Sequence, residues 1–300
     1  MTDYAALLRA LAVPRLVGTP NHAQVRERLK HELTARGFAV EEHAFAGRPS
    51  RMLFGTPPVV HGVNLIAQRA AARPSIWLAA HYDSKGQPIS MAMRIVGSAA
   101  AVLGAAATLV ALAVGWTVLP ALAVFALGAA VLAGNRVTDQ SPGGLDNATG
   151  LVAILAILDA LPSPRNADVG VLFLDAEEFG LVGARALVTD RAALLEGAAV
   201  INFDSLDDRG RSIAFLHRHG PIGRAVAAEL GALQWRWLPV IVDGIALGRR
   251  GGPVRECVTI MKGDWGTARV VHTPRDRVER LTLEGVRQVV QGVARALASP

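Results

Sequence analysis

The sequence has a single cysteine, Cys257, so no disulfide can form within the chain. This cysteine lies in the apolar run 257–261, which predicts a buried strand, and we interpret its thiol as a packing group. The chain also lacks internal repeats and low-complexity linkers. With 51% hydrophobic and 19% charged residues in 300, the composition argues against a disordered chain, and the length is normal for one large α/β domain with a packed core.

Signatures of nucleic-acid binding are missing, although the chain is basic, with 31 Lys and Arg against 25 Asp and Glu. A basic chain suits either an anionic membrane surface or a nucleic acid. No basic helix interleaved with aromatic residues occurs, and no zinc-finger, winged or RNA-binding motif, so we expect no nucleic-acid partner. The first residues, 1–4, lack the basic-then-apolar layout of a signal peptide, and we expect the globular part of the chain in the cytoplasm.

One long stretch lacks charge altogether. No charged residue occurs between Arg94 and Arg136, and much of the excess in the mean hydropathy of +0.33 lies there. Gly115, Trp116 and Pro120 interrupt its middle. Because a helical span takes about 20 apolar residues, residues 91–136 predict an inserted helical hairpin that contacts membrane lipid, with roughly two passes.

Two alternatives to a spanning hairpin remain open at this stage. The first is a buried pair of Ala/Gly-rich helices, and the second is a re-entrant hairpin, since the second arm at 121–133 is short for a full span. Small residues recur in both arms, which suits close helix packing in lipid. The flanking basic residues Lys85, Arg94 and Arg136 favour the cytoplasmic side for both ends.

Outside this stretch, apolar strands alternate with helical segments. Strands are predicted at 38–45, 63–68, 76–80, 169–174, 199–203 and 257–261, and helices at 4–12, 22–36, 147–160, 181–188, 221–231 and 283–298. Such alternation predicts an α/β fold of three layers, with a mixed sheet between two layers of helices. We therefore expect a catalytic domain formed by residues 1–90 and 137–300, with residues 91–136 inserted into it.

Acids and histidines follow several of these strands, where ligands bind in such sheets. His81 directly follows the strand at 76–80, Glu177 and Glu178 follow the strand at 169–174, and Asp204 ends the strand at 199–203. Asp146 precedes the helix at 147–160, and His272 lies in a late loop. Each has an ordinary explanation by itself, such as a helix cap for Asp146 or loop polarity for His272. Together, however, these residue types form the ligand set of one or two zinc ions.

The local sequences around these residues resemble one family of enzymes, the co-catalytic zinc aminopeptidases of peptidase family M28. The resemblance covers the chain apart from the apolar stretch and is carried by five motifs in order. They are His81-Tyr82-Asp83-Ser84, Gly144-Leu145-Asp146-Asn147-Ala148-Thr149-Gly150, Glu177-Glu178-Phe179-Gly180-Leu181-Val182-Gly183-Ala184, Asn202-Phe203-Asp204 and His272-Thr273-Pro274-Arg275-Asp276.

The resemblance implies a zinc-exopeptidase fold and a role for each motif. Two Zn²⁺ ions are implied, or Co²⁺ or Mn²⁺ in their place, with a peptide as substrate. Asp146 bridges the ions, His81 and Asp204 complete one site, and Glu178 and His272 complete the other. Glu177 is the general base, and Asp83 is the carboxylate that fixes the tautomer of His81. The peptide bond Asp146–Asn147 is expected to be cis.

One segment at the expected substrate site departs from the family pattern, and other functions remain open. Family members often carry Ser-Asp-His-x-x-Phe at the substrate site, whereas residues 242–247 here read Val-Asp-Gly-Ile-Ala-Leu. The nearest alternatives are a glutaminyl cyclase-like transferase and another zinc exopeptidase. A further alternative is a non-catalytic, membrane-associated binding domain, against which the complete ligand set argues. The sequence gives no prediction of the oligomeric state.

Overall fold

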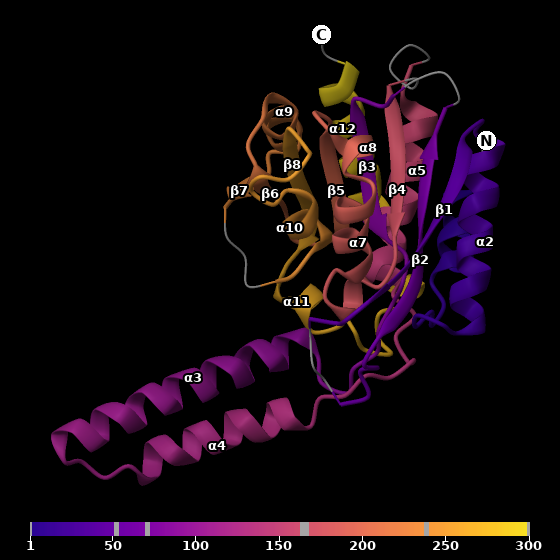
Figure 1. Cartoon of the computed structure of the whole chain (residues 1–300). Coiled ribbons are helices and arrows are strands. Elements are labelled where there is room, and N and C mark those ends of the chain that lie inside the picture. Colours follow the sequence, from indigo (N-terminus) through magenta and orange to yellow (C-terminus); the bar gives the residue numbers. More distant parts are fainter. Residues whose placement is uncertain (1, 51–53, 70–72, 163–167, 237–239, 299–300) are drawn as a thin grey trace.

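Eight strands form one mixed sheet through the middle of the molecule (Figure 1). The computed structural model describes residues 2–50, 54–69, 73–162, 168–236 and 240–298. The strand order is β1-β2-β4-β3-β5-β8-β6-β7, and the strands are β1 Ala39–Gly47, β2 Val60–Gln68, β3 Ile76–His81, β4 Val169–Leu174, β5 Ala199–Leu206, β6 Arg211–Arg218, β7 Leu233–Trp235 and β8 Glu256–Gly263. The four central strands β4, β3, β5 and β8 run parallel. The antiparallel pairs lie toward the two edges of the sheet.

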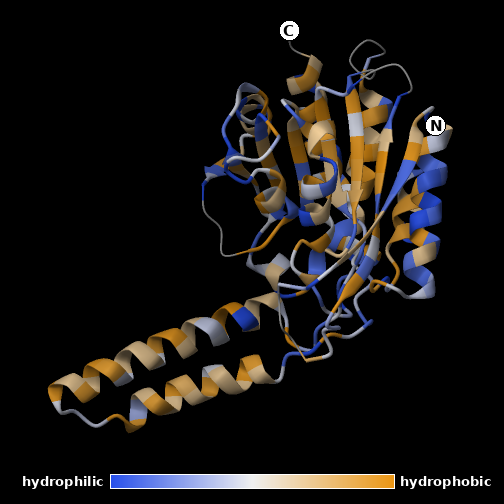
Figure 2. Ribbon diagram, in the orientation of Figure 1, coloured by the Kyte–Doolittle hydropathy of each residue, from blue (hydrophilic) through white to orange (hydrophobic). Residues whose placement is uncertain are grey.

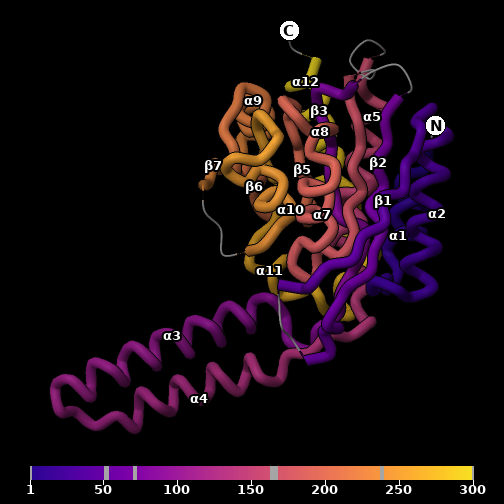
Figure 3. The backbone as a smooth tube through the Cα atoms, viewed as in Figure 1, coloured from indigo at the N-terminus to yellow at the C-terminus, as the bar shows by residue number. Residues whose placement is uncertain are grey.

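Helices cover both faces of the sheet (Figures 1 and 3). They are α1 Tyr4–Leu11, α2 Pro20–Ala35, α3 Met91–Val114, α4 Leu119–Ala133, α5 Thr149–Ala160, α7 Val182–Asp190, α8 Ala192–Leu195, α9 Pro221–Glu229, α10 Asp243–Leu247, α11 Trp265–Ala268 and α12 Glu284–Ala298, with short helical turns η1 Gly144–Ala148, η2 Glu177–Phe179 and η3 Val278–Arg280. Leu78 and Ala80 of β3 point to a core shared with α1, α2, α5 and α12. Trp77 and Ala79 point to the opposite core, shared with α7 and α10. The predicted three-layer fold with a mixed sheet is therefore confirmed.

Local signals explain where the main elements begin and end. Thr19 caps α2 by accepting a hydrogen bond from the backbone N–H of His22, and Pro20 occupies the first turn. Gly37, at φ 78°, follows the end of the same helix in the left-handed conformation that glycine adopts without strain. Every residue of β3, β4 and β5 is buried because both faces of the central sheet are covered.

The structure adds elements that the pattern of the sequence did not predict. β7 consists of three exposed residues at the sheet edge, so it carries no burial pattern to detect. The short helices α8, α10 and α11 span only four or five residues each, which is less than two helical turns. Cys257 is buried within β8, as expected for a packing group.

The uncharged stretch forms two helices, α3 and α4, that project from the sheet as an apolar arm (Figures 1 and 2). Gly115, in the left-handed conformation at φ 74°, ends α3. At 1.5 Å per residue, the 24 residues of α3 reach about 36 Å, enough for the hydrocarbon core of about 30 Å, whereas the 15 residues of α4 reach only about 22 Å. Among the described residues, α3 alone is long and apolar enough to cross a membrane, so two passes are not supported, and α3 is a candidate for one by length and composition only.

Candidate metal centre

The predicted site residues come together at the carboxyl ends of the central strands. His81 is the last residue of β3, and the Glu177–Glu178 pair forms η2 directly after β4. Asp204 lies in β5, next to a shift in register between Phe203 and Leu206. Asp146 lies in the η1 turn before α5, and His272 follows α11. All of them are buried.

Asp146 occupies the centre of the cluster, with one carboxylate oxygen toward each histidine. His81 Nε2 lies 3.1 Å from Asp146 Oδ1, and His272 Nε2 lies 3.0 Å from Asp146 Oδ2. His272 Nε2 is also 2.9 Å from Glu178 Oε1. Asp146 is therefore shared between two sets of candidate ligands.

Two triads have ligand atoms close enough to hold one ion each. One consists of His81, Asp146 and Asp204, the other of Asp146, Glu178 and His272, and within each the ligand atoms lie within 4.8 Å of one another. Two histidines and three carboxylates are donors that zinc accepts.

The carboxylate oxygens of Glu178 are buried without a well-formed hydrogen bond from a described residue. Lys85 Nζ lies 3.1 Å from Oε2, and it donates a hydrogen bond to the main-chain oxygen of Glu178. Lys85 is 1% exposed, so this charge balances the site and does not reach the surface. The two oxygens of Glu178 thus face His272 and Lys85 without a well-formed hydrogen bond, an arrangement in which they could also bind a metal ion.

The buried acids Asp204 and Glu177, in one half of the site, both have a raised pKa. Burial, together with the nearby Asp146 carboxylate, raises the pKa of Asp204 to about 7. Burial likewise raises the pKa of Glu177 well above its ordinary value, with the neighbouring Glu178 carboxylate adding to the effect. The site thus contains more acidic groups than its basic side chains neutralise.

The other half of the site is kept ionised by its basic neighbours. Burial opposes ionisation of Asp146, but hydrogen bonds from His272 and His81 hold its pKa well below the usual range. Glu178 is equally buried, yet His272 and Lys85 lower its pKa to about 2. Asp146 and Glu178 are therefore carboxylates at neutral pH, the form that binds metal.

Three further buried carboxylates fix the loops that carry these residues. Asp83 accepts the backbone N–H groups of Glu177 at 3.1 Å and Glu178 at 3.2 Å. Asp276 does the same for the η1 turn, accepting the N–H groups of Leu145 and Asp146. Asp175 accepts hydrogen bonds from the N–H of Val63 and the hydroxyl of Tyr82, and it pairs with His22 at 2.8 Å.

The geometry at Asp83 differs in detail from the expected one. His81 Nδ1 lies 3.1 Å from the main-chain oxygen of Asp83 and 3.5 Å from its carboxylate oxygen Oδ1. The carbonyl is thus the better partner, and an Nδ1–H donated to it leaves Nε2 of His81 free to face Asp146. Asp83 therefore acts on the His81 tautomer through its backbone, while its side chain holds the Glu177–Glu178 turn. The peptide bond between Asp146 and Asn147 is cis, as expected.

Arg15 is the main structural residue that sequence reasoning missed. It is fully buried and donates to the carbonyl oxygens of Tyr82 at 2.7 Å, Pro142 at 2.6 Å and Gly143 at 3.0 Å. These acceptors belong to the loops of His81 and Asp146, so one guanidinium joins both. No pattern in the sequence distinguishes Arg15 from surface arginines, because its partners are more than 60 residues away.

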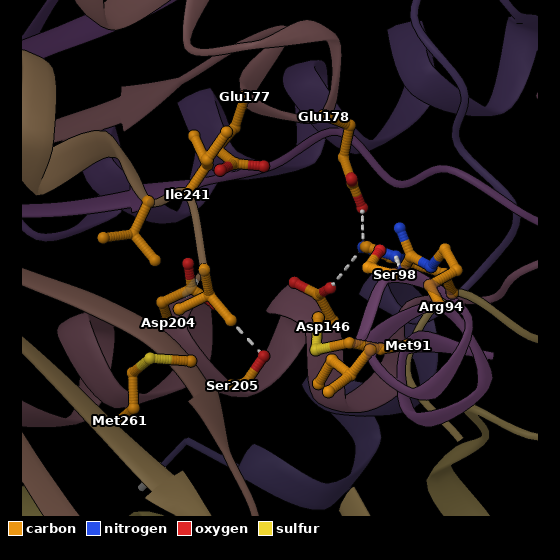
Figure 4. A pocket seen from close by; sticks show the side chains of 14 residues that line it. Met91, Arg94, Ser98, Asp146, Glu177, Glu178, Asp204, Ser205, Ile241 and Met261 are labelled. Atoms are coloured by element: carbon orange, nitrogen blue, oxygen red, sulfur yellow. Dashed lines mark hydrogen bonds and ion pairs between the residues drawn. The ribbon is translucent and has the colours of Figure 1, made fainter. Parts of the chain in front are cut away.

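The first turns of α3 form one wall of the pocket above the cluster (Figure 4). This pocket has a volume of about 310 Å³, and α3 contributes Met91, Arg94, Ile95 and Ser98 to its lining. Arg94 Nη2 donates to Nδ1 of His272 at 2.5 Å. A cation bound at Nε2 of His272 would require the proton on Nδ1, and Arg94 would then have to turn away.

Two of the three basic residues that flank the apolar stretch do not face a membrane surface. Lys85 and Arg94 were expected to flank the apolar stretch as surface charges, but both side chains face the acidic site. Arg136 alone remains exposed among the three. The positive-inside rule counts charges that meet the membrane surface, so it gives little support here for a cytoplasmic side.

Known proteins share this arrangement of elements. No curated protein sequence matches the chain. The LapA aminopeptidase of Legionella pneumophila superimposes with a TM-score of 0.64 at 13% identity, covering 99% of this chain and 72% of that one. The Porphyromonas gingivalis glutaminyl cyclase gives 0.64 at 18% identity, with 98% and 96% covered. BSAP, a zinc aminopeptidase from Bacillus subtilis, gives 0.61 at 13% identity, with 98% and 93% covered.

At these identities the structural similarity shows the fold alone. The sequence shows the family, because residues 64–297 match the profile of Peptidase family M28. This match spans most of the chain and includes every residue of the two triads. The chain therefore belongs to Peptidase family M28.

Proposed function

We propose that this protein is a zinc-dependent aminopeptidase that holds two Zn²⁺ ions, with Co²⁺ and Mn²⁺ as possible substitutes. The observation that carries the proposal is the shared position of Asp146, whose two oxygens face His81 and His272 separately. His81, Asp146 and Asp204 would hold one ion. Asp146, Glu178 and His272 would hold the other. The unsatisfied oxygens of Glu178 and the raised pKa of Asp204 both favour added positive charge.

Glu177 is proposed as the general base and then the general acid. It is the one carboxylate that lines the pocket and belongs to neither triad, so its proton-carrying oxygens stay free. When bound, the zinc ions would activate a water molecule and polarise the scissile carbonyl. Glu177 then takes a proton from the attacking water and delivers it to the leaving amine. Its buried environment suits this role, because burial raises the pKa of Glu177 and a carboxylate of raised pKa is a stronger base toward the water proton.

The pocket favours a peptide with a free amino end and an apolar first side chain. The carboxylates of the cluster attract an α-ammonium group, while Met91, Ile95, Ile241 and Met261 present apolar surface. The volume of about 310 Å³ limits the site to roughly one residue and its scissile bond. We therefore expect removal of single apolar residues from the N-terminus of a peptide.

A panel of aminoacyl chromogenic substrates tests this function directly. Detergent-purified protein is assayed with and without a zinc chelator, followed by addition of Zn²⁺. We expect chelator-sensitive release that zinc restores, with the leucyl and methionyl substrates ahead of the aspartyl and lysyl ones. The absence of release from every substrate would contradict the aminopeptidase proposal and favour cyclisation of N-terminal Gln, another exopeptidase activity or a binding role.

The Glu177→Gln variant tests the role of this residue. Glutamine keeps the size of the side chain but cannot accept the proton, so turnover should fall by about 10²–10⁴-fold. Zinc content, measured by elemental analysis, should stay at the wild-type value because Glu177 belongs to neither triad. Glu279→Gln, an exposed glutamate in η3, is the matched control and should leave both values unchanged. Turnover near the wild-type level in Glu177→Gln would refute the assignment.

Glutaminyl cyclisation is the second candidate function. The Porphyromonas gingivalis glutaminyl cyclase covers as much of this chain as the aminopeptidases do, at an equal TM-score to LapA. The two reactions differ in product, since cyclisation of an N-terminal Gln releases ammonia and leaves the peptide bond intact. Incubation with a Gln-Ala peptide and mass analysis of the product distinguishes them. A loss of 17 mass units, on the order expected for ammonia, would favour the cyclase.

We also propose that residues 91–136 form a membrane-associated arm on a catalytic domain made of residues 1–90 and 137–300. Its support is the exposure of large apolar side chains along both helices, including Leu103, Leu109, Leu119 and Leu127 at 67–72%. Figure 2 shows that hydrophobic residues predominate along both helices. Only 17% of the most apolar part of α3 is buried, whereas a core helix would be mostly covered. We expect the part of α3 beyond its pocket-lining first turns to insert in the membrane, with α4 packed beside it.

Shortening the arm tests its role without touching the pocket. Residues 106–123 are replaced by two glycines, joining the helices near the contact between Gly104 and Phe125. We expect the shortened protein in the soluble fraction after lysis without detergent, with aminopeptidase activity retained, because the pocket-lining residues of α3 precede the cut. A full-length protein that is already soluble without detergent would refute the membrane proposal.

A further inference from the structure

A second cavity, of about 790 Å³, lies at the base of the arm on the other side of α3 from the active-site pocket. Its apolar floor includes Val96, Gly97 and Ala100 of α3 and Val131 of α4. Its remaining wall comes from α11 and the loop that follows, which contribute Trp265, Arg269 and Arg275. The groove therefore joins lipid-facing helix surface to the edge of the catalytic domain, where α11 meets the base of α3 (Figure 1).

Close packing of glycines sets the width of this groove. A Cβ added at Gly128 would lie 2.5 Å from the backbone nitrogen of Ala101, and one at Gly97 would lie 2.9 Å from a methyl carbon of Val131. The helices thus approach closely, and the small side chains beside the contact leave a channel along the outside of the pair. An acyl chain is the kind of group that such an apolar channel accommodates.

The end of the groove at α11 is positively charged and unpaired. Arg269 and Arg275 are exposed, and neither guanidinium has a hydrogen bond or ion pair with another described residue. No acidic side chain lines the groove in the part of the chain that the structure describes. Trp265 is 50% exposed beside them, in the position that tryptophan takes at the interface between headgroups and acyl chains.

We propose that this groove binds one anionic phospholipid, with an acyl chain along Val96, Gly97 and Ala100 and the phosphate at Arg269 and Arg275. The inference deepens the proposed membrane association and rests on it. Two guanidinium groups favour a phosphate because they form charge-assisted hydrogen bonds with its oxygens. The apolar floor favours a lipid over a soluble phosphate, since a soluble ligand would leave that surface exposed.

The site lies beside the catalytic pocket because α3 separates the two. Along the same turns, Met91, Arg94 and Ile95 face the pocket, whereas Ala92, Met93 and Val96 face the groove. A lipid in the groove would therefore contact the first turns of α3, which carry the Arg94 side chain that bonds His272.

Thermal unfolding in mixed micelles tests the lipid site independently of hydrolysis. Detergent-purified protein is titrated with short-chain phosphatidylglycerol, and the rise in Tm gives an apparent Kd through the mass-action relation. We expect saturable stabilisation of the wild type, and an apparent Kd at least tenfold weaker in the double variant Arg269→Gln/Arg275→Gln. The matched control Arg9→Gln/Arg224→Gln removes the same charge from exposed positions on α1 and α9, and it should bind as the wild type does.

A second variant covers the case in which the arginine pair is needed for folding. Ala100→Leu fills the groove while both arginines remain, and it should also weaken binding at least tenfold. Equal stabilisation by short-chain phosphatidylcholine, equal stabilisation by glycerol phosphate, or equal weakening in the control double variant would each overturn the proposal. Release of the wild type from membranes by alkaline carbonate would refute the anchor alone, so the two failures are distinguishable.

Discussion

The buried guanidinium of Arg15 illustrates how single residues stabilise this site. Its hydrogen bonds go to carbonyl oxygens of Tyr82, Pro142 and Gly143, in the loops that carry His81 and Asp146. We expect Arg15→Ala to lower the free energy of unfolding by about 3–5 kcal/mol, because several buried acceptors lose their donor. Urea denaturation gives the measurement. Arg224→Ala, at an exposed position on α9, should change it by less than about 0.5 kcal/mol.

A second residue, His217, predicts a dependence of stability on pH. Burial lowers its pKa from 6.5 to about 4, and its ring bonds Thr259 at 2.9 Å. As pH falls from 6.5 to 4, the unfolded chain takes up a proton that the folded chain does not, so stability falls. The loss approaches about 3 kcal/mol at pH 4.

The His217→Gln variant isolates this contribution from other titrating groups. Glutamine keeps a hydrogen-bonding partner for Thr259 but does not titrate, so the difference in unfolding free energy between wild type and variant should change by about 3 kcal/mol between pH 7 and 4. A difference that stays constant across this range would show that His217 is not buried in its neutral form. The side chain of His217 is covered because Gly244 packs against its ring and Gly248 against its Cβ, where a larger residue would clash.

At the scale of secondary structure, α3 has three separate contacts. It packs on α4, lines the catalytic pocket and lines the groove beneath α11. The interface with α4 depends on glycine, because a Cβ at Gly104 or Gly128 would meet the backbone of the opposite helix. Backbone atoms cannot move aside as a flexible side chain does, so the helices themselves must separate.

We therefore expect the double variant Gly104→Ala/Gly128→Ala to increase the separation of α3 and α4 by about 1 Å. Spin labels at the exposed positions Leu109 and Leu122 would report this change as a longer distance by pulsed electron paramagnetic resonance. Gly134→Ala is the matched control, because its added Cβ would meet atoms no nearer than 3.5 Å. An unchanged distance in the double variant would show that the helices are not in close contact.

At the scale of the whole molecule, the buried carboxylates of the metal centre destabilise the folded state unless positive charge balances them. Burial raises the pKa of Asp204 and Glu177 in the same site, which means that their ionised forms are destabilised there. Bound divalent cations would offset this, and they bind the folded chain preferentially. We expect removal of metal by a chelator to lower Tm by about 5 °C or more, with recovery when Zn²⁺ is added.

The Asp204→Asn variant provides the comparison for this measurement. It removes one candidate ligand and one buried acid, so the metal-free variant should be more stable than the metal-free wild type, and its response to chelator should be smaller. Equal Tm values for wild type with and without chelator would contradict tight metal binding at this centre.

The sequence by itself determined the layers of the fold and the residue types at the strand ends. Hydrophobic periodicity is a local property, so β3, β4, β5 and most helices are recognisable from runs of a few residues. The motifs around His81 and Asp146 are equally local, and they were sufficient to suggest a metal centre. The uncharged stretch likewise predicted apolar helices, although the lengths of α3 and α4 depend on where each helix ends.

Only the tertiary structure decided which distant residues meet. The contacts of Arg15 with Pro142, of Asp83 with the Glu177–Glu178 turn and of Arg94 with His272 join positions between 94 and 178 residues apart. Their geometry depends on the strand order, which brings β3 beside β4 and β5 although residues 82–168 separate β3 from β4 in the chain. No local pattern encodes such a pairing, because it is set by which apolar faces bury one another when the whole chain folds.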